Sequence, residues 1–305
     1  MALKNVALIG ASGTLGPSIL KALQSSNFDV SILNRSSSKS KYSITHVITV
    51  PDDLNVPALT ALFKENSIDA LVISIAGSYV EEQKRLIQAA FNAGVKRVIP
   101  AEFGSCDSAD DATVQLLPLM EGKKRVRGFL EELSAKDREG GNLTWTSLVT
   151  GHFFDHGLST GLLKLNIKGR KAYLQDGGNI KFSGTNLDTI GTAVAKVLQP
   201  ENEEKTKNKL LYIHSFSVTQ NEILDVLEQV TGQKWERVYE DSKKQIGEAR
   251  PKMLEGDDDA REEVVSVWGI VASDWRKKEG FANQLIGLQK ESLEEVVKRV
   301  VQNVK

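Results

Sequence analysis

An amine on an apolar helix face is the side chain of this sequence best placed for proton chemistry. Leu119, Val126, Leu130 and Leu133 fall on one helical stripe, and Lys123 lies inside it, four residues after Leu119. Burial among aliphatic side chains favours the neutral form of an amine, so its pKa falls towards the range that serves proton exchange near neutral pH. The alternative is a lysine at the edge of the stripe, whose stem packs while its charged end reaches water. The spacing alone favours this alternative.

A glycine-rich segment near the N-terminus has the composition of a phosphate-binding loop. The run GASGTLG at 10–16 directly follows the apolar run 6–9 and precedes a segment with helical spacing. Glycine there lets the backbone turn tightly and approach a pyrophosphate, whose charge meets the unpaired amides at a helix N-terminus. The spacing is G-x-x-G-x-x-G rather than the common G-x-G-x-x-G, and a plain tight turn is the alternative. We expect the cofactor to contact Gly10, Ser12, Gly13, Thr14, Leu15 and Gly16.

A basic side chain at the end of the second apolar run predicts which dinucleotide is bound. An NAD site usually has a carboxylate at this place, which accepts hydrogen bonds from the adenosine ribose. This sequence has Arg35, whose forked guanidinium can donate to the 2′-phosphate of NADP, with Lys39 or Lys41 nearby as a second cation. A solvated basic loop is the alternative interpretation. The residues predict NADPH as the cofactor, with Arg35 and Lys41 at its phosphate.

The first half of the chain alternates short β-branched runs with longer helical stretches, which is typical of βαβ units around a parallel sheet. We expect strands at 6–9, 30–33, 46–48, 70–73, 97–99 and 143–149, and crossover helices at 17–23, 56–63 and 81–91. The fold class is therefore α/β, with a doubly wound Rossmann parallel sheet over 1–150 that binds NADPH. In such sheets ligands bind beyond the carboxyl ends of the strands, where the glycine loop meets Ser74, Ile75, Ala76, Glu102 and Phe103.

In the second half, short predicted strands are followed by a helix-rich end. This pattern predicts a smaller, helix-rich C-terminal substrate lobe over 151–305. We expect strands at 171–174, 179–182 and 210–213, and helices at 187–198, 220–230, 260–270 and 292–301. Polar, turn-rich segments at 34–42, 104–113 and 201–209 predict surface loops. We leave open that part of this half returns to the Rossmann sheet.

Composition and charge exclude several classes of protein. Lys and Arg number 39 and Asp and Glu 40, for a net charge of −1, and no stretch concentrates basic residues, so nucleic acid is not an expected partner. Cys106 is the single cysteine, which precludes an intrachain disulfide and fits a reducing compartment. No run approaches the ~20 apolar residues of a membrane span, and the first predicted strand leaves no room for a cleavable signal. We therefore expect a cytoplasmic monomer or homodimer with a small-molecule substrate, no metal and no membrane anchor.

Aromatic and histidine side chains follow the sixth predicted strand. Phe153 and Phe154 could form an apolar wall against a flat substrate or the nicotinamide, although aromatic pairs after a strand are more often core. His152 and His156 are further candidates for proton transfer, with a structural or exposed position as the alternative for each. We expect the substrate to contact Phe103, Gly151, His152, Phe153, Phe154 and His156.

Two further patterns resemble known sites but lie in the wrong place. Tyr239 and Lys243 fit Tyr-x-x-x-Lys, the catalytic pair of ordinary short-chain dehydrogenases, far beyond the sheet region where that pair would face a nicotinamide. The acidic run 257–259 has no calcium-loop spacing, and consecutive carboxylates point in different directions. We expect a solvated loop or a helix start there, and we give His46 and His214 no role.

The order and spacing of these motifs resemble those of a known family. The glycine loop, Arg35, ISIAG at 73–77, PAEFG at 100–104 and MEGK at 120–123, leading to Arg127, resemble the isoflavone reductase and phenylcoumaran benzylic ether reductase branch of the NmrA-like, atypical short-chain dehydrogenase family. DTIG at 188–191 is similar to that family's Asp-Ile-Gly helix. The likeness therefore spans most of the chain.

This resemblance implies an NADPH-dependent reductase that transfers hydride to a carbonyl, imine, conjugated alkene or benzylic ether carbon of a small aromatic or polycyclic metabolite. It implies that Lys123 is the catalytic lysine and contacts the cofactor beside the nicotinamide. It also implies that 74–76 pass near the ribose and nicotinamide, and that the segment after the sixth strand lines the active site. GHFF at 151–154 departs there from the Asn-containing run of the plant enzymes, and Gly128 follows Arg127 where they often have a second Arg. The identity of the substrate is therefore not carried over.

Two other functions fit the same motifs. One is an NmrA-type regulatory protein that senses the dinucleotide and docks on a partner without catalysis, for which a lysine in an apolar stripe has no use. The other is a redox-neutral isomerase or cyclase that keeps the bound nucleotide.

Overall fold

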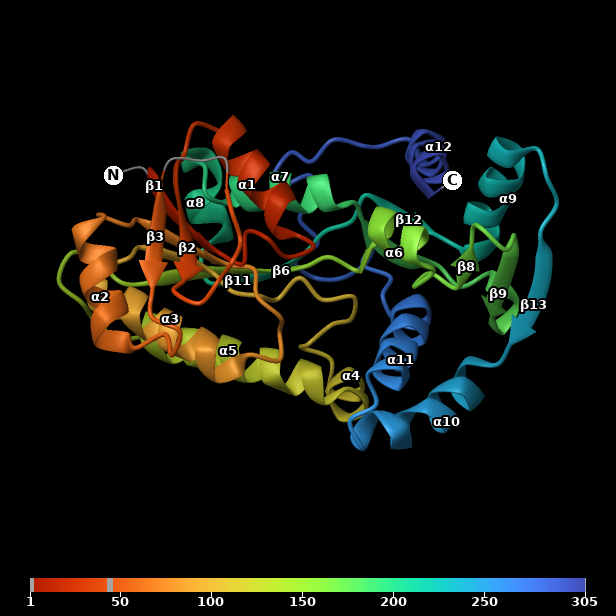
Figure 1. The fold of residues 1–305 in the computed structure, drawn as a ribbon, viewed down its shortest axis with the longest axis horizontal. Coiled ribbons are helices and arrows are strands. Elements are labelled where there is room, and N and C mark those ends of the chain that lie inside the picture. The colour runs from red at the N-terminus through yellow and green to blue at the C-terminus, as the bar shows by residue number, and fades with distance from the viewer. Residues whose placement is uncertain (1–2, 43–45, 305) are drawn as a thin grey trace.

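The computed structural model describes residues 3–42 and 46–304, and its centre is a seven-stranded parallel sheet (Figure 1). The strand order β11-β6-β5-β4-β1-β2-β3 reverses direction between β1 and β4, which is the doubly wound arrangement, so the predicted fold class is confirmed. Its strands are β1 (Asn5–Ile9), β2 (Asp29–Arg35), β3 (Val47–Val50), β4 (Ala70–Ile73), β5 (Arg97–Ile99), β6 (Thr144–Val149) and β11 (Lys209–Tyr212).

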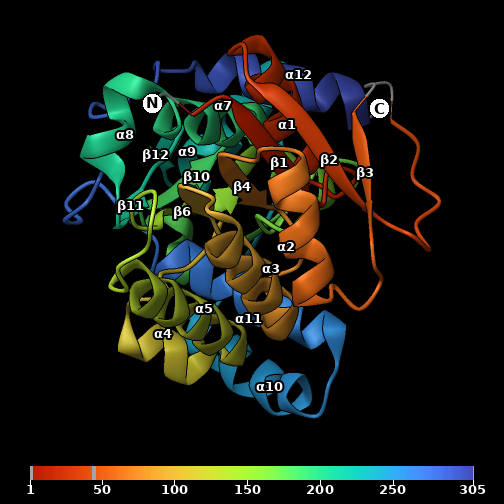
Figure 2. The same ribbon diagram turned by 90° about the vertical axis from the view of Figure 1, so that its left-hand side faces the viewer.

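Helices cover both faces of this sheet because its strands are apolar on both sides (Figure 2). In β1, Val6 and Leu8 pack into the core under α1 and α7, whereas Ala7 and Ile9 pack into the core under α2, α3 and α5. Both cores are fully buried, so the sheet is fixed from both sides. These helices are α1 (Gly16–Ser25), α2 (Val56–Glu65), α3 (Val80–Ala93), α5 (Pro118–Ser134) and α7 (Leu187–Val197).

A close contact between α1 and α7 accounts for the DTIG segment. A Cβ atom on Gly191 would lie 2.3 Å from the carbonyl oxygen of Ser18, so only glycine lets the two helices approach. Asp188, one turn earlier, accepts hydrogen bonds from Ser18 Oγ and Lys21 Nζ, both at 2.7 Å. The motif therefore holds α7 against the helix that follows the glycine loop.

The second half of the chain adds two three-stranded sheets and further helices around a separate core (Figure 1). The strands are β7 (His152–Phe153), β8 (Leu165–Asn166), β9 (Lys171–Gln175), β10 (Phe182–Thr185), β12 (Phe216–Val218) and β13 (Glu236–Glu240). The helices are α6 (Phe154–Thr160), α9 (Gln220–Thr231), α10 (Ser242–Leu254), α11 (Asp258–Val271) and α12 (Leu293–Val304), with a short 3-10 turn η1 at Asp176–Gly178. Within the described ranges no helix is long and apolar enough to cross a membrane.

The prediction of a surface loop at 201–209 is wrong. This segment contains most of α8 (Pro200–Thr206) and the first residue of β11. Arg97 of β5 supports the helix: its buried guanidinium donates to the Glu203 carbonyl at 2.8 Å and to Thr206 Oγ1 at 3.3 Å. A long-range contact to a buried arginine thus stabilises a helix whose polar composition predicts a loop.

Two other predicted boundaries are shifted. α4 (Asp111–Leu116) begins inside the predicted loop 104–113, because the Asp110 side chain caps it by accepting from the Thr113 amide at 2.8 Å. β10 begins at Phe182, where the strand predicted at 179–182 ends, since its residues pair with β12 and β7 only from there onward.

Part of the second half returns to the Rossmann sheet. β11 pairs with β6 in parallel register, from Lys209 opposite Thr146 to Tyr212 opposite Val149. Ala282 and Ile286 pack into the core under α1 and α7. The Rossmann layer is therefore built from residues on both sides of position 150, and the division drawn there is not a clean structural boundary.

Candidate active site

The three glycines of the loop between β1 and α1 have different structural tasks. Gly10 has a φ of +87°, and a Cβ atom on it would lie 2.2 Å from the Ser74 carbonyl oxygen. A Cβ on Gly16 would lie 2.3 Å from the Gly10 oxygen, so both glycines serve backbone packing. The nearest atom to a Cβ on Gly13 is the Gly10 oxygen at 3.4 Å. Gly13 is therefore the one of these three glycines that backbone packing does not require.

A cavity of about 360 Å³ lies beyond the carboxyl ends of β1, β4 and β5, as the fold class predicts. It unites the glycine loop with the segments after β4 and β5. Most of the predicted cofactor residues line it. Those residues are Gly13, Thr14, Leu15, Ser74, Ile75, Ala76, Glu102, Phe103 and Lys123, to which the structure adds Gly77, Ala101 and Phe153.

Arg35, Lys41 and Ser12 lie outside this cavity. Arg35 ends β2 with its guanidinium 5.9 Å from the centre of the Tyr79 ring, and it forms no ion pair among the described residues. Ser12 Oγ accepts from Ser40 Oγ at 3.2 Å, which places the glycine loop beside the loop that follows β2. The arrangement leaves a guanidinium beside the loop, while Lys41 is exposed.

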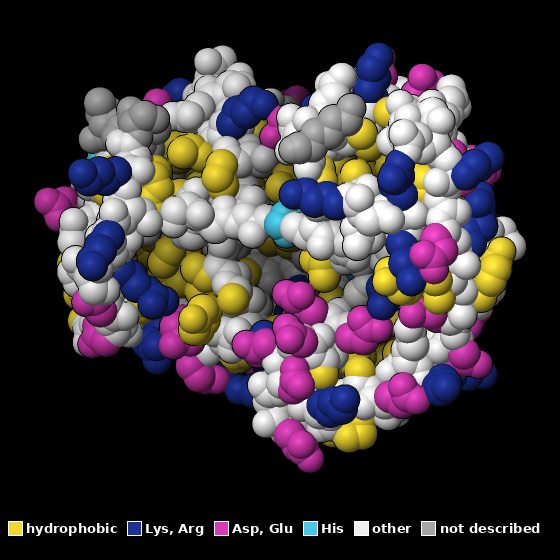
Figure 3. All heavy atoms as spheres, turned by 45° about the vertical axis from the view of Figure 1, so that its right-hand side comes forward, with side chains coloured by type: hydrophobic (Ala, Val, Ile, Leu, Met, Phe, Trp, Pro, Cys, Tyr) yellow, Lys and Arg dark blue, Asp and Glu magenta, His cyan; other side chains and the backbone are white. Residues whose placement is uncertain are grey.

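A second cavity of about 210 Å³ adjoins the first and is mainly apolar. Figure 3 shows a hollowed face of the molecule with hydrophobic side chains in and around the hollow and acidic side chains along part of its rim. The predicted substrate residues Phe103, Gly151, His152, Phe153 and His156 line this cavity. Lys123, the predicted catalytic residue, also lines it, and the structure adds residues that were not predicted as substrate contacts: Gly104, Ser105, Leu119, Met120, Gly157, Leu162 and Val265.

Lys123 lines both cavities, together with Phe103 and Phe153. The predicted apolar face of α5 is confirmed, because Lys123 is only 8% exposed and Val126, Leu130 and Leu133 are buried with it. Its Nζ donates to the main-chain carbonyl of Glu102. Burial lowers the pKa of the Lys123 amine, while the Glu102 carboxylate and Cys106 act in the opposite direction. The amine therefore lies buried at the junction of the two cavities, with a lowered pKa.

Two glycines make room for this amine. A Cβ on Gly77 would lie 2.9 Å from Lys123 Cε, and a Cβ on Gly104 would lie 3.2 Å from Nζ. Phe103, next to Gly104, has a φ of +21°, an unusual backbone conformation for a residue other than glycine. The loop after β5 is thus shaped closely around the lysine side chain.

The carboxylate of Glu102 faces Arg127, one turn after Lys123 on α5. Glu102 is 2% exposed, and its Oε2 lies 3.2 Å from Arg127 Nη1. The same Nη1 donates to Ser108 Oγ at 2.6 Å, and Nη2 donates to the Ser108 carbonyl at 3.3 Å. Arg127, part of the motif noted in the sequence, therefore anchors the two loop segments that border the amine.

A second buried carboxylate lies close to this pair. Asp107 Oδ1 accepts from the Tyr212 hydroxyl at 3.0 Å, and its Oδ2 lies 2.6 Å from Lys278 Nζ. Burial, followed by the charge of Asp107 and their hydrogen bond, raises the pKa of Tyr212. The phenol thus stays neutral and acts as a hydrogen-bond donor to Asp107.

The geometry does not favour His152 as a proton donor. Its ring lines the second cavity, but Nε2 is 3.2 Å from the Ser266 carbonyl oxygen, to which it donates in the tautomer protonated on Nε2. A Cβ on Gly269 would lie 2.3 Å from the same nitrogen, so α11 packs directly against the ring. Burial lowers the pKa of His152 to about 4. A catalytic role for His152 stays a prediction that these contacts do not support.

The prediction that Phe154 contacts the substrate is wrong. Phe154 is 0% exposed and packs in the C-terminal core, where its ring centre lies 4.8 Å from that of Phe216. Phe153, its neighbour, is half-buried and lines both cavities. Because α6 begins at Phe154, the chain turns between the two rings and sends them to opposite sides.

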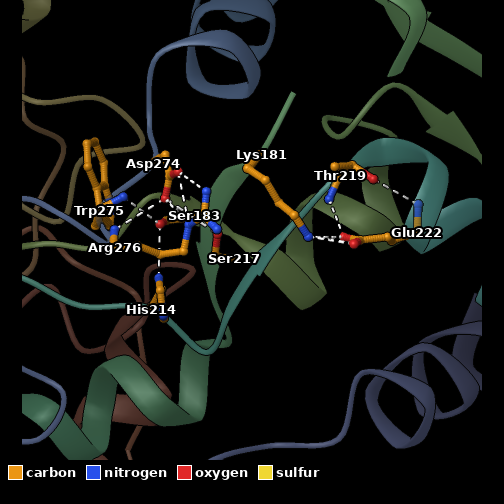
Figure 4. Close-up of polar contacts among 9 residues, drawn as sticks. All are labelled: Lys181, Ser183, His214, Ser217, Thr219, Glu222, Asp274, Trp275 and Arg276. Atoms are coloured by element: carbon orange, nitrogen blue, oxygen red, sulfur yellow. Dashed lines mark hydrogen bonds and ion pairs between the residues drawn. The ribbon is translucent and has the colours of Figure 1, made fainter. Parts of the chain in front are cut away.

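His214, which has no predicted role, belongs to a partly buried polar cluster in which Asp274 and Arg276 are exposed (Figure 4). Its Nδ1 lies 3.0 Å from Ser183 Oγ, which also accepts from the Trp275 amide at 3.0 Å. Asp274 nearby is held by Arg276 through bonds from Nε at 2.9 and 3.0 Å. Ser183 is fully buried, so this Ser-His pair is out of reach of a substrate and fastens the segment 273–276 to β10.

The two rejected patterns lie outside the site. Tyr239 is 67% exposed on β13, and neither it nor Lys243 lines either cavity. Asp257 caps α11 by accepting from the Ala260 amide at 3.0 Å, so the predicted helix start is confirmed.

Most of the chain matches one known family. The model of the NmrA-like family covers residues 2–256. The chain belongs to the NmrA-like family. The resemblance found in the sequence is thereby confirmed, and members of its reductase branch are among the relatives.

Three relatives illustrate the similarity. The oxidoreductase aprR of Aspergillus flavus is 32% identical over 302 residues, which cover 97% of this chain and 98% of the relative. An isoflavone reductase homolog of Solanum tuberosum is 26% identical over 249 residues, or 77% of each chain. A solved structure described as AtPrR2 with NADP+ and (+)pinoresinol has a TM-score of 0.77 at 18% identity and covers 98% of this chain and 99% of that one. The last likeness shows a shared fold.

Proposed function

We propose that this protein is an NADPH-dependent reductase that transfers hydride to a small aromatic or polycyclic metabolite, with Lys123 as general acid or base. The observation that carries the proposal is the position of the Lys123 amine, which is buried and lines both the cavity beneath the glycine loop and the apolar cavity. Relatives named as oxidoreductases that match 96–97% of the chain support redox chemistry.

The residues present fit the dinucleotide at both ends of its site. Gly13 leaves its backbone open to a pyrophosphate at the start of α1, whose first amides favour negative charge. Arg35 offers a guanidinium without an ion-pair partner among the described residues, which suits a 2′-phosphate. The NADP+ held by AtPrR2, which shares the fold, supports the same choice.

When bound, NADPH supplies the hydride. The Glu102 carbonyl oxygen orients the Lys123 amine towards the junction of the two cavities. In its ammonium form this side chain gives a proton to the acceptor, so that one hydride and one proton are added in a two-electron reduction. The neutral amine then regains a proton from solvent, and burial, which lowers the pKa of Lys123, favours release of the proton to the acceptor.

The second cavity supports a flat, mainly apolar acceptor. Phe103, Phe153 and Leu119 provide its walls next to the amine, and they exclude water from the reacting atoms. A carbonyl, imine, conjugated alkene or benzylic ether carbon placed there would present its electron-poor atom near the first cavity and its heteroatom near Lys123.

The test is incubation of the purified protein with NADPH and a panel of aromatic carbonyl, enone and benzylic ether compounds. We expect NADPH oxidation with at least one compound, and a product heavier than the substrate by one hydride and one proton. Cofactor binding without oxidation by any compound would instead favour the dinucleotide sensor. A product of unchanged mass without net NADPH consumption would identify an isomerase or cyclase.

A further inference from the structure

The groups around the Lys123 amine determine its charge. Glu102 and Cys106 face it from the loop after β5, and Arg127 lies one turn away on α5. His152 and His156 line the same cavity from β7 and α6. Burial raises the pKa of the Cys106 thiol to about 11, and the pKa of His152 is lowered to about 4, so both are neutral near pH 7. Glu102 is thus the charged group that acts on the amine, and Arg127 is the cation paired with Glu102.

Each buried carboxylate near the site already has a cation of its own. Glu102 lies 3.2 Å from Arg127, and Asp107 lies 2.6 Å from Lys278. Among the described residues Lys123 forms no ion pair, and its hydrogen bond goes to a neutral carbonyl. The Oε1 atom of Glu102 is buried without a hydrogen-bond partner in this part of the chain. The carboxylate therefore retains an acceptor that an ammonium could use.

We propose that Arg127 is a positioning residue for Lys123: it binds the Glu102 carboxylate as its own counter-ion and ties it to Ser108, which leaves the amine with a neutral carbonyl as its partner. The inference rests on the function proposed above, because it concerns the same amine. It adds to that function a residue that sets the working pH without touching the substrate, since Arg127 lines neither cavity.

Four variants separate this role from a purely structural one. Arg127→Gln removes one positive charge and frees the Glu102 carboxylate, and both effects raise the pKa of Lys123 by about one unit or more. Glu102→Gln removes the negative charge and leaves Arg127 unpaired, so the pKa moves down. Combining Arg127→Gln with Glu102→Gln should return the pKa of Lys123 towards its wild-type value. Arg127→Lys keeps a cation at the position, so the pKa of Lys123 should stay close to its wild-type value.

The experiment is a pH titration of Lys123 by NMR in protein whose lysines are isotope-labelled at Cε. It uses the full chain without cofactor, and the Lys123 resonance is identified by its loss in Lys123→Met. Arg125→Gln serves as the matched control, because Arg125 is an exposed arginine of the same helix that pairs with Glu81. We expect opposite shifts for Arg127→Gln and Glu102→Gln, and no shift for the control.

A pKa of Lys123 that is unchanged or lowered in Arg127→Gln would overturn the proposal. If Arg127→Gln does not fold, Glu102→Gln tests the proposal by itself. A pKa of Lys123 that is unchanged or raised in Glu102→Gln would contradict the proposal equally. The NMR readout needs no turnover, so the expected shifts in a protein that oxidises no NADPH would refute the proposed reductase while the role of Arg127 stands. Where turnover is found, the pH limb of kcat should follow the same directions.

Discussion

Lys123 and Glu102 are joined through the main chain rather than through their charges: the amine donates to the Glu102 carbonyl, while the Glu102 carboxylate lies 3.2 Å from Arg127. A lysine buried in this way has lost its hydration without gaining a counter-ion of its own, which lowers its pKa. This relationship holds the amine at the junction of two cavities with a neutral carbonyl as its hydrogen-bond partner.

Replacement of Lys123 by Met should stop the chemistry but spare the cofactor. We expect turnover to fall by ~100-fold or more, the scale of one general acid or base, with NADPH affinity nearly unchanged. Lys124→Met is the control, since Lys124 is an exposed neighbour paired with Asp111. Steady-state kinetics and a fluorescence titration with NADPH measure the two quantities. Normal turnover in Lys123→Met would remove this residue from the mechanism.

Replacement of Arg35 by Ala should change the choice of cofactor. The variant loses a charge-assisted hydrogen bond to the 2′-phosphate, so NADPH binding should weaken by about tenfold or more while NADH binding changes little. Isothermal titration with both nucleotides measures the ratio. An equal loss for the two cofactors would show that Arg35 does not bind the phosphate.

Substitutions at two glycines of the loop should have different effects, one on nucleotide binding and one on stability. Gly13→Val should fold normally but lose nucleotide binding, because its side chain enters the space left open beside Ser74. Gly10→Ala should destabilise the fold itself, since its φ is +87° and its Cβ would lie 2.2 Å from the Ser74 oxygen. Thermal unfolding with and without NADPH distinguishes the two, with Gly128→Ala, which meets nothing within 4 Å, as the control. Retained NADPH stabilisation in Gly13→Val would contradict the loop assignment.

The adjacent rings of Phe153 and Phe154 should have separable effects. Phe154→Ala empties part of the C-terminal core and should lower the free energy of unfolding by about 3–5 kcal/mol without altering KM. Phe153→Ala should cost much less stability and raise KM for the best compound of the panel, because this ring lines both cavities. The reverse pattern in urea denaturation and kinetics would show that Phe154, rather than Phe153, faces the substrate.

One buried and one half-buried histidine, His152 and His214, should make stability depend on pH. Burial lowers the pKa of both His152 and His214 to about 4, whereas a histidine in the unfolded chain titrates near ~6.5. Between these values the unfolded chain binds protons that the folded chain does not. The free energy of unfolding should therefore fall as the pH drops from about 6.5 to about 4, by at most about 3 kcal/mol per histidine.

Urea denaturation at several pH values tests this dependence in the wild type and in His152→Gln and His214→Gln. Each variant should lose part of the slope between about pH 6.5 and about pH 4. A slope that is the same in all three proteins would show that these histidines are not held neutral by the fold.

Local pattern was sufficient for the features that depend on neighbouring residues. The glycine loop, the alternation of apolar strands and crossover helices, and the apolar stripe around Lys123 are all local, and the structure places them as expected. Even so, the stripe alone favoured a lysine with its charged end in water. The amine is buried because the loop after β5 covers it, and the spacing of apolar residues in the helix does not predict this loop contact.

Features that depend on distant partners could not be predicted in this way. The partners of Arg127 lie 25 and 19 residues away along the chain, and α8 is fixed by Arg97, which precedes it by more than a hundred residues. Phe153 and Phe154 are chemically identical neighbours, and only the start of α6 between them sends one to the cavities and the other to the core. Sequence types identify the groups, whereas tertiary contacts determine which of them face the site.

The most direct test of the central claim is a crystal structure of the protein with NADPH bound. We expect the pyrophosphate to lie on Gly13, and the nicotinamide to lie in the first cavity with its reactive carbon towards the Lys123 amine and the second cavity. A nicotinamide bound elsewhere, or a Lys123 amine turned into solvent in the complex, would contradict the proposed mechanism.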